Sequence, residues 1–389
     1  MAEIKNLKKL AKRILKAIKN KERIILFGDS DMDGACSVII LKETICSLGG
    51  DSPVIYFSDR KREEHGINKQ ALKLLKDKAP ALLISLDCGI GNFKEVDLAK
   101  KFGFTVAIVD HHDILNKKPK AKIIVNPKQG RKSSSFYYLA AAGIAFKLAE
   151  EMLGKNISKT LREDILSLAA LATFTDFVPE VGENQLILEE GLPILENSWR
   201  PAVKFFFISD LTQKCISTRE IIWKIISIIN ITDKEGVLNE IYLFLISKSL
   251  EEAESRFAEF LNKASERQAK IRRVVEELKA RIAFQDKNQL IIFEGLDDCP
   301  FPFVSAVAGR ISNFAKKPTF IFTREKKENW GTFNMPSAEN GVEALTKCAK
   351  FLRRYGGHPP VGGFYFEDKN SDKLKQGLIK YFSNQHKSV

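Results

Sequence analysis

The sequence lacks any hydrophobic run long enough to cross a membrane and any closely spaced pair of cysteines. A membrane-spanning helix needs ~18 unbroken apolar residues, whereas the longest candidate stretch, 221–231, is interrupted by Lys224. The N-terminus is basic but has no apolar core region, so we expect no secretory signal. None of the six cysteines belongs to a C-x-x-C pair, which argues against structural zinc and against a disulfide framework. We therefore expect a cytoplasmic protein that has no membrane partner.

Acidic residues are fewer than basic ones. The 389 residues include 62 Lys and Arg against 49 Asp and Glu, which gives a formal net charge of +13. Such a balance favours polyanionic partners, above all nucleic acid, although a charge spread without pattern is the alternative. The length is sufficient for two or three domains.

Three aspartates alternate directly after the apolar run 24–28, at Asp29, Asp31 and Asp33. Carboxylates placed this closely repel one another unless cations lie between them. A turn or a helix cap is the ordinary alternative. A calcium loop of the EF-hand type would need a glutamate at its twelfth position, where Ile40 stands, and a helix before it, where we expect a strand.

Three later segments also end in acidic or histidine residues. Two of these segments read as apolar strands and one as a helical apolar stretch. The residues at their ends are Asp87, Asp110, His111, His112 and Asp176. Because a doubly wound sheet aligns the carboxyl ends of its parallel strands, the groups that end the strands should converge on one edge. Carboxylates with imidazole suit manganese, magnesium, iron or zinc, and an oxygen-rich set favours the first two.

The order of the expected elements predicts an α/β protein. The strands expected first are 24–28, 53–57, 82–87, 104–109 and 121–125, and the helices between them are 35–48, 67–78 and 93–102. This alternation implies a parallel sheet with helices on both faces. The pattern is then helical from 135 to 250, with helices at 136–153 and 160–174, a largely helical stretch at 221–246 and an aromatic run at 205–207 that we expect in the core.

A long uninterrupted helix is expected at 251–283. It carries many Lys and Arg residues, and we favour a connector with a basic face toward substrate over a solvated surface helix. A smaller α/β unit follows, with strands at 290–293, 319–322, 330–333 and 363–366 and helices at 303–314, 341–352 and 373–383. Near its end, glycines on both sides of His358 would let a backbone approach a ligand closely, although Gly and Pro also mark ordinary turns.

Five segments, in this order, resemble the DHH phosphoesterase superfamily and, within it, the RecJ-like nuclease branch. The segments are 28–34, Asp87, 110–112, 175–179 and, near the C-terminus, 356–358. The resemblance spans nearly the whole chain. It implies an N-terminal parallel-sheet DHH catalytic domain at 1–250, with its sheet part at about 20–127 and its helical part at about 135–250. It also implies a connector helix at 251–285 and a smaller C-terminal α/β domain, the substrate-binding DHHA1 domain, at 286–389.

The resemblance further implies a two-metal phosphodiesterase that usually depends on Mn²⁺, with Mg²⁺ as the other option. One metal would be held by Asp31 and Asp87 with a contribution from Asp29, and the other by Asp33, Asp87, His111 and Asp176. His112 would touch the scissile phosphate or orient a ligand. The catalytic residues expected are Asp31, Asp33, Asp87, His111, His112 and Asp176. The substrate contacts expected are Arg60, His65, Arg310, Gly356, Gly357 and His358.

The function implied is an exonuclease acting on single-stranded DNA or RNA, with replication or repair proteins as further partners. One alternative is a phosphodiesterase or phosphatase for short oligonucleotides, cyclic dinucleotides or a phosphorylated adenosine nucleotide. Another is a nucleic-acid-binding subunit of a replication or repair complex. RecJ-like bacterial enzymes carry a Gly-Ser-x-Arg pattern that helps to seat a 5′-phosphate, and the corresponding stretch 331–334 reads Gly-Thr-Phe-Asn. Polarity is therefore left open, and the chain looks closer to the compact archaeal relatives.

Overall fold

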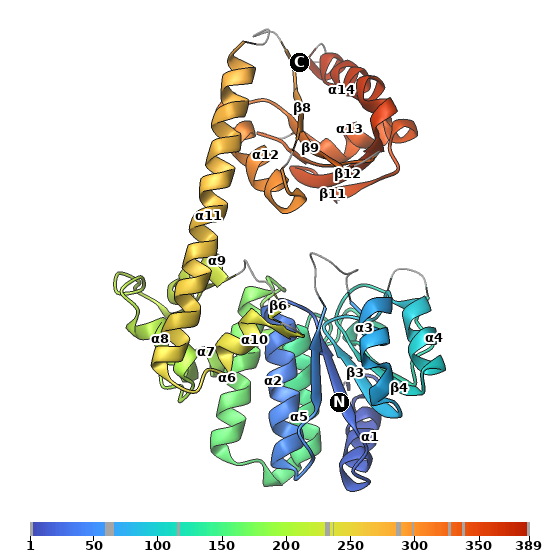
Figure 1. Cartoon of the computed structure of the whole chain (residues 1–389), viewed down its shortest axis with the longest axis vertical. Helices are drawn as coiled ribbons and strands as arrows, with labels where there is room; N and C mark the ends of the chain where they lie inside the picture. Colours follow the sequence, from blue (N-terminus) through green and yellow to red (C-terminus); the bar gives the residue numbers. More distant parts are fainter. Residues whose placement is uncertain are drawn as a thin grey trace. The chain divides into compact units, whose positions relative to one another are not determined.

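The computed structural model describes residues 3–58, 66–114, 117–229, 234–235, 237–284, 289–297, 299–325, 328–336 and 339–386. The chain forms two compact units, Met1–Ala264 and Ser265–Val389. The long helix α11 (Leu250–Ala283) begins in the first unit and ends in the second (Figure 1). Each unit has its own sheet and its own hydrophobic core.

The first unit is built on a five-stranded parallel sheet with the strand order β2-β1-β3-β4-β5. The strands are β1 (Ile24–Gly28), β2 (Val54–Phe57), β3 (Ala81–Leu86), β4 (Phe104–Val109) and β5 (Ile123–Val125). Both faces are covered, because Leu26 packs in one core cluster while its neighbours Ile25 and Phe27 pack in another. The predicted parallel sheet is thus confirmed.

Helices cover both faces of this sheet (Figure 1). Side chains of α1, α2, α5 and α6 contribute to the larger core cluster, and side chains of α3 and α4 to the smaller one. The helices are α1 (Leu7–Lys19), α2 (Met32–Ser47), α3 (Lys69–Leu75), α4 (Phe93–Lys101), α5 (Ala141–Leu153), α6 (Lys159–Thr175), α7 (Glu183–Leu195), α8 (Pro201–Ile208), α9 (Thr218–Ile229) and α10 (Glu240–Leu245).

Several helical elements differ from the sequence-based expectation. The helix expected at 136–153 begins only at Ala141, and α7 and α8 had no specific prediction. The stretch 221–246 is divided into α9 and α10 by the short strands β6 (Lys234–Glu235) and β7 (Leu238–Asn239). Asn239 starts α10 because its side chain accepts hydrogen bonds from two backbone N–H groups of the helix. The aromatic run at 205–207 lies in the core as predicted, with Phe206 fully buried.

The second unit contains a mixed five-stranded sheet with the order β11-β12-β10-β9-β8. Its strands are β8 (Ile292–Leu296), β9 (Thr319–Glu325), β10 (Glu328–Asn334), β11 (Arg354–His358) and β12 (Val361–Glu367), and its helices after α11 are α12 (Phe301–Ala315), α13 (Gly341–Lys347) and α14 (Ser371–His386). Strands β8 and β9 are parallel and the other pairs are antiparallel. The predicted second α/β unit is confirmed, but β11 was not anticipated as a strand.

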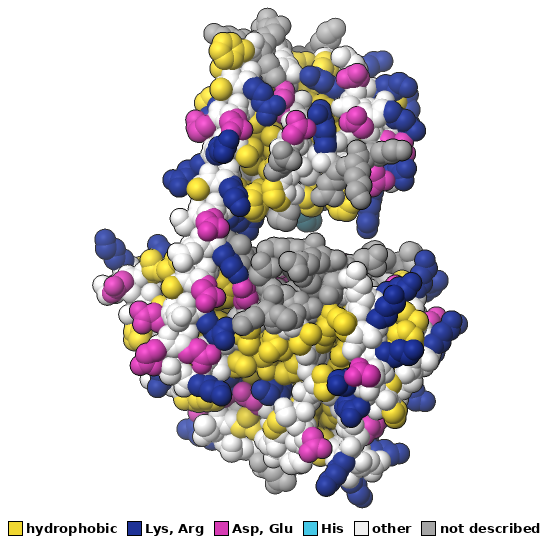
Figure 2. All heavy atoms as spheres, viewed as in Figure 1, with side chains coloured by type: hydrophobic (Ala, Val, Ile, Leu, Met, Phe, Trp, Pro, Cys, Tyr) yellow, Lys and Arg dark blue, Asp and Glu magenta, His cyan; other side chains and the backbone are white. Residues whose placement is uncertain are grey.

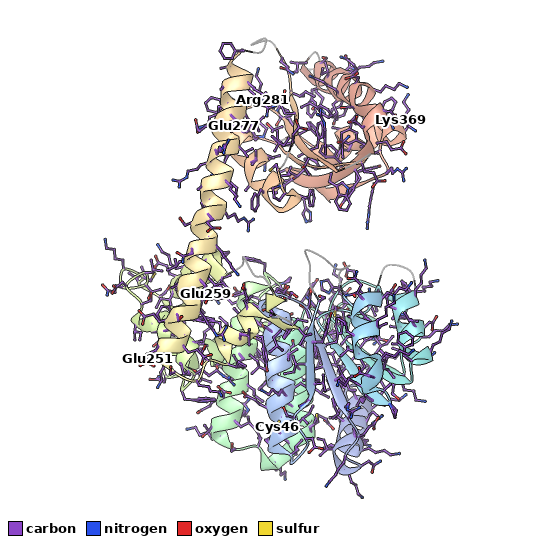
Figure 3. The ribbon with its side chains drawn as sticks, in the orientation of Figure 1. Cys46, Glu251, Glu259, Glu277, Arg281 and Lys369 are labelled. Atoms are coloured by element: carbon purple, nitrogen blue, oxygen red, sulfur yellow. The ribbon has the colours of Figure 1, made fainter. Side chains whose placement is uncertain are left out.

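Helix α11 buries one side in each unit and exposes charged residues elsewhere. Phe257 and Phe260 pack in the core of the first unit, and Val275 and Leu278 in that of the second. Acidic side chains such as Glu251, Glu259 and Glu277 and the basic Arg281 stand along its length (Figure 3). Several of its basic residues pair with acids, in the ion pairs Arg256–Glu252, Lys263–Glu240, Arg273–Glu277 and Lys279–Glu276. These pairs neutralise part of the basic charge of the helix. A basic face toward substrate stays a prediction.

Lys and Arg side chains are scattered over the visible face of each unit, among Asp and Glu (Figure 2). This face therefore agrees with a charge spread without pattern. Among the described residues, no helix combines the length and the apolar character that a membrane span requires.

Candidate metal centre

The acidic residues predicted to converge follow the carboxyl ends of adjacent parallel strands. Asp29 follows β1, Asp87 follows β3 and Asp110 follows β4, and these strands are hydrogen-bonded neighbours. All three aspartates are buried. They therefore lie at one edge of the sheet, where α/β proteins place their sites.

The loop after β1 is fixed by its own carboxylates. Asp31 is the N-cap of α2, and its side chain accepts a hydrogen bond from the backbone N–H of Gly34 at 3.0 Å. Asp29 Oδ1 accepts one from the backbone N–H of Ser30 at 2.7 Å. Gly34 is required for this turn, because a Cβ at that position would lie 2.3 Å from the carbonyl oxygen of Asp29. The calcium-loop alternative is excluded by the strand that precedes the loop.

Asp33 is held from a distant part of the chain. Its two carboxylate oxygens accept hydrogen bonds from the backbone N–H groups of Ala141 and Ala142, both at 2.7 Å. These residues form the first turn of α5, where backbone N–H groups have no partner within the helix. The contact explains why α5 begins at Ala141, and no signal in the sequence linked the two segments.

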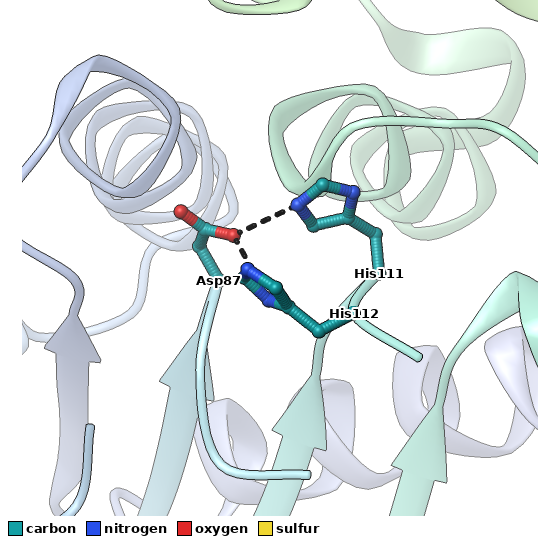
Figure 4. Close-up of side chains that lie close together, drawn as sticks. All are labelled: Asp87, His111 and His112. Atoms are coloured by element: carbon teal, nitrogen blue, oxygen red, sulfur yellow. Dashed lines mark ion pairs between the residues drawn. The ribbon is translucent and has the colours of Figure 1, made fainter. Parts of the chain in front are cut away.

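His111 brings the remaining carboxylates together. Its Nε2 lies 3.2 Å from Asp87 Oδ1, 3.5 Å from Asp176 Oδ2 and 3.9 Å from Asp33 Oδ2. Figure 4 shows Asp87 Oδ1 facing the rings of both His111 and His112. Asp176 reaches this cluster from the C-cap position of α6. The predicted ligands Asp33, Asp87, His111 and Asp176 therefore lie around one point.

Three atoms of this cluster are unsatisfied. Among the described residues, Asp87 Oδ1, His111 Nε2 and Asp176 Oδ2 are buried and have no hydrogen-bond partner. Buried polar atoms are nearly always satisfied, so an unsatisfied group calls for an explanation such as an ion. The distances from His111 Nε2 to Asp87 Oδ1 and to Asp176 Oδ2, 3.2 and 3.5 Å, are slightly wider than the ~3 Å between neighbouring ligands of an octahedral ion with ~2.1 Å bonds. A divalent cation therefore fits between them without forcing the ligands apart.

A second ligand group adjoins the first. Asp29, Asp31 and Asp87 each offer an oxygen, and these atoms lie within 4.8 Å of one another. The same limit holds for the group Asp33, His111 and Asp176. Asp87 belongs to the group with Asp29 and Asp31 and also faces His111, so its carboxylate can contribute to both groups. The arrangement offers oxygen-rich places for two cations that share one carboxylate.

Asp110 orients His112 rather than entering the cluster. Asp110 Oδ1 lies 2.8 Å from His112 Nδ1 and accepts a hydrogen bond from the backbone N–H of His112, while its Oδ2 accepts one from Ile90. The hydrogen bond and negative charge of Asp110 raise the pKa of His112 against the opposing effect of burial. Burial by itself would raise the pKa of Asp110, but the hydrogen bonds and charge of His112 lower it. The His112 side chain is half exposed, as expected of a group that meets a ligand.

Burial and mutual repulsion hold several carboxyl groups away from their ordinary pKa. Burial, followed by the charge of Asp31, raises the pKa of Asp33 to about 7. Burial, followed by the charge of Asp33, raises the pKa of Asp176 to about 7. The pKa of Asp87 is raised well above its usual value by burial and the nearby aspartates, whereas burial lowers the pKa of His111. Such perturbed groups cluster at functional sites.

Asp87 also has a strained backbone. Its φ of 63° lies in the left-handed region that residues other than glycine rarely adopt. The backbone N–H of Asp87 donates to the carbonyl of Val109 at 2.9 Å, which ties the turn to β4. Strain of this kind persists where the surroundings hold a residue in a functional position.

None of the predicted substrate contacts is a described residue of the first unit, which contains the candidate metal centre. Arg60 and His65 lie outside the described residues. Arg310 lies on α12 of the second unit, where its guanidinium donates to Gln268 Oε1 at 2.5 Å. The remaining residues, Gly356, Gly357 and His358, lie on β11 of the second unit.

The glycine-rich segment forms a hairpin between β11 and β12. Gly357 has a φ of 136°, and a Cβ there would lie 2.4 Å from the Cα of Gly362 on the partner strand. Strand pairing therefore accounts for Gly357 without a ligand. Gly356 faces open space and His358 is exposed, so both remain accessible.

The chain is similar in sequence to known proteins. Residues 23–173 match the family described as DHH family, N-terminal domain. The chain is 29% identical over 390 residues to the single-stranded-DNA-specific exonuclease RecJ of Bacillus subtilis, a match that covers 98% of this chain and 48% of the relative. It is 26% identical over 380 residues to RecJ of Thermus thermophilus, covering 97% and 54%. The chain thus spans about half the length of these curated relatives.

Solved structures agree in fold. A crystal structure of exonuclease RecJ bound to manganese aligns with a TM-score of 0.76 at 24% identity, covering 98% of this chain and 95% of that one. RecJ of Thermus thermophilus in complex with Mn²⁺ aligns with the same TM-score at 21% identity, covering 98% and 55%. These structures confirm the predicted fold class. The sequence matches described above confirm the predicted resemblance to DHH phosphoesterases and to RecJ-like nucleases.

Proposed function

We propose that the chain is a metal-dependent exonuclease that hydrolyses phosphodiester bonds of single-stranded nucleic acid. The observation that carries this proposal is the set of buried, unsatisfied atoms Asp87 Oδ1, His111 Nε2 and Asp176 Oδ2. A site of this composition is unfavourable without cations and suited to phosphate chemistry with them. The similarity to single-stranded-DNA-specific exonucleases supports the choice of substrate.

We assign two divalent cations to the cluster, Mn²⁺ above all and Mg²⁺ as the other option. Asp29, Asp31 and Asp87 would hold one cation, and Asp33, Asp87, His111 and Asp176 the other. Bound cations of this kind stabilise charge on phosphodiester oxygens and lower the pKa of bound water.

The other residues of the chain orient these groups. The N-terminus of α5 fixes Asp33 through Ala141 and Ala142. Asp110 holds the Nδ1 side of the His112 ring, and it raises the pKa of His112 so that the ring is available as a proton donor to an anionic phosphate. His112 is thus placed to bind or protonate a substrate oxygen, and Asp110 acts through it as a positioning residue.

The proposal is tested by digestion of end-labelled single-stranded DNA and RNA with added Mn²⁺. Labels at either end report the polarity, and strands of about two and about thirty residues distinguish a nuclease from an enzyme for short oligonucleotides. We expect Asp87→Asn to abolish hydrolysis, because it removes the carboxylate shared by both cation groups.

Asp113→Asn is the matched control for this substitution. The Asp113 side chain is 72% exposed and pairs with Lys128 at 2.9 Å, outside the cluster. We expect this variant to keep its activity. Intact strands under all conditions, or full activity in Asp87→Asn, would refute the proposal.

We also propose that the protein is cytoplasmic. It would act in DNA repair or replication, together with other proteins of those processes. All six cysteines are free, which is compatible with a reducing compartment. Retention of the protein in the cytoplasmic fraction, and sensitivity of a deletion strain to DNA damage, are the measurements that test this assignment.

A further inference from the structure

Two large aromatic side chains are exposed together, and one of them directly follows a residue of the candidate metal centre. Phe177 directly follows Asp176, and the residue is 65% exposed. Trp223, on α9, is 48% exposed. Their ring centroids lie 5.0 Å apart with the planes tilted by 42°. Single exposed apolar residues are common in proteins, but a contacting pair of exposed aromatics points to an interaction site.

The pair is supported from behind. The ring of Phe174 meets Trp223 edge-on at 6.0 Å, and the guanidinium of Arg219 lies 5.1 Å from the Phe174 centroid. Arg219 and Trp223 are four residues apart on α9 and so share a helix face. Arg219 also donates two hydrogen bonds of 2.7 Å to the carboxylate of Glu180. These contacts tie α9 to the segment after α6 and hold the rings in place.

The backbone of Phe177 is unusual for such a side chain. Its φ of 55° lies in the left-handed region, directly after the C-cap residue Asp176. This position at a helix end is typically occupied by glycine, since a Cβ is disfavoured there. A phenylalanine that is strained and also mostly exposed stabilises neither the helix end nor the core. A contact made with a ligand would account for it.

The place of Phe177 in the chain connects the pair to the candidate metal centre. Asp176 Oδ2 lies 3.5 Å from His111 Nε2, within the cluster to which we assign phosphodiester hydrolysis. Consecutive Cα atoms are ~3.8 Å apart, so the backbone of Phe177 lies one residue away from a member of this cluster. The positive charge of Arg219 is already paired with Glu180, so the surface offers aromatic faces rather than a phosphate contact.

We propose that Phe177 and Trp223 form a platform on which a base of the single-stranded substrate stacks beside the metal centre. This inference rests on the proposed nuclease function. It adds that a base of the strand, and not only its phosphate, would contact the protein. Base–aromatic stacking is tolerant of sequence, because every base has a flat face. The platform would therefore favour strands with bases over abasic strands, without preference for one base.

The test compares Phe177→Ala and Trp223→Ala with the matched control Trp199→Ala. Trp199 is another exposed tryptophan of the first unit, and the residue is 55% exposed. Binding is measured with a fluorescent oligonucleotide and with an abasic strand of equal length, in the Asp87→Asn background so that the strand is not cleaved. We expect each platform variant to bind the normal strand about tenfold more weakly, or ~1.4 kcal/mol, and the abasic strand nearly unchanged.

Two further readouts separate stacking from a structural effect. In the active protein, KM for single strands should rise while kcat for bound substrate changes little, and Trp223→Phe should restore most of the affinity because it keeps a flat ring. The dependence of binding on salt should keep its slope, because no phosphate contact is removed. Circular dichroism verifies that the variants are folded.

The outcomes are distinguishable. If the unsubstituted protein cleaves no strand with Mn²⁺, the proposed function fails. If it cleaves, but the platform variants bind both strands as Trp199→Ala does, only the platform is refuted. Equal weakening toward normal and abasic strands would also refute it. Loss of a protein–protein association with unchanged strand binding would assign the pair to a protein interface and overturn the inference.

Discussion

Without divalent cations, the protein should lose stability as the pH rises toward neutrality. Burial raises the pKa of Asp33 from 3.8 to about 7. The folded protein then retains a proton that the unfolded chain has already released, so the free energy of unfolding falls as the pH rises from about 4 through about 7. For Asp33 alone the change is ~4 kcal/mol, since each pKa unit corresponds to ~1.36 kcal/mol. Asp176, with a pKa also raised to about 7, acts in the same direction.

The assay is urea unfolding in chelator and in Mn²⁺, from about pH 5 to about pH 8. In chelator the midpoint should fall with pH, and the gain from Mn²⁺ should increase over the same range, because only ionised carboxylates bind the cation. Asp176→Asn should flatten the pH dependence in chelator and raise stability at about pH 8, since it removes charge from the cluster without removing a hydrogen bond from Asp176 Oδ2.

Asp113→Asn is again the matched control. Its hydrogen bond and ion pair with Lys128 lower the pKa of Asp113, so the pH dependence between about 5 and about 8 should keep its slope. A chelated protein that gains stability over this range, or an Mn²⁺ effect independent of pH, would contradict the argument that repulsion among buried carboxylates is relieved by cations.

Two other substitutions test how the fold supports the site. Arg200→Met should destabilise the protein by ~3–5 kcal/mol, because it leaves the buried carboxylate of Asp164 without its bidentate partner. Urea unfolding measures the loss of stability. A change below ~1 kcal/mol would show that Arg200 does not stabilise the fold through Asp164. Gly34→Ala should abolish the stabilisation by Mn²⁺, because its Cβ would displace Asp29, whereas Gly91→Ala has open space and should match the unsubstituted protein. Thermal unfolding with and without Mn²⁺ compares the two variants, and an unchanged metal response in Gly34→Ala would show that the turn tolerates the added carbon.

The part of the site on the strand ends could be predicted from the sequence. Asp29, Asp87 and His111 each follow an apolar run of strand length, and the rule that parallel strands share a carboxyl edge is sufficient to bring them together. Asp176 was located by its place after a helical stretch and by the resemblance, but periodicity alone could not place it against His111.

Other features could not be predicted because they depend on contacts between distant segments. The support of Asp33 by Ala141 involves a backbone N–H, which every residue except proline possesses and which leaves no trace in the sequence. β11 has an exposed, glycine-rich sequence that lacks the apolar alternation of a half-buried strand. Only its antiparallel pairing with β12 makes it a strand.

Several locally unfavourable features occur together at the candidate metal centre. Asp87 combines a left-handed backbone, a raised pKa and a buried oxygen without a hydrogen bond. Each of these is unfavourable for folding, and each becomes tolerable if the carboxylate is bound between cations. Several unfavourable features that meet at one residue, and that bound cations would relieve together, indicate selection for function rather than for stability. The same reasoning predicts that replacing Asp87 by asparagine stabilises the cation-free protein while it removes hydrolysis.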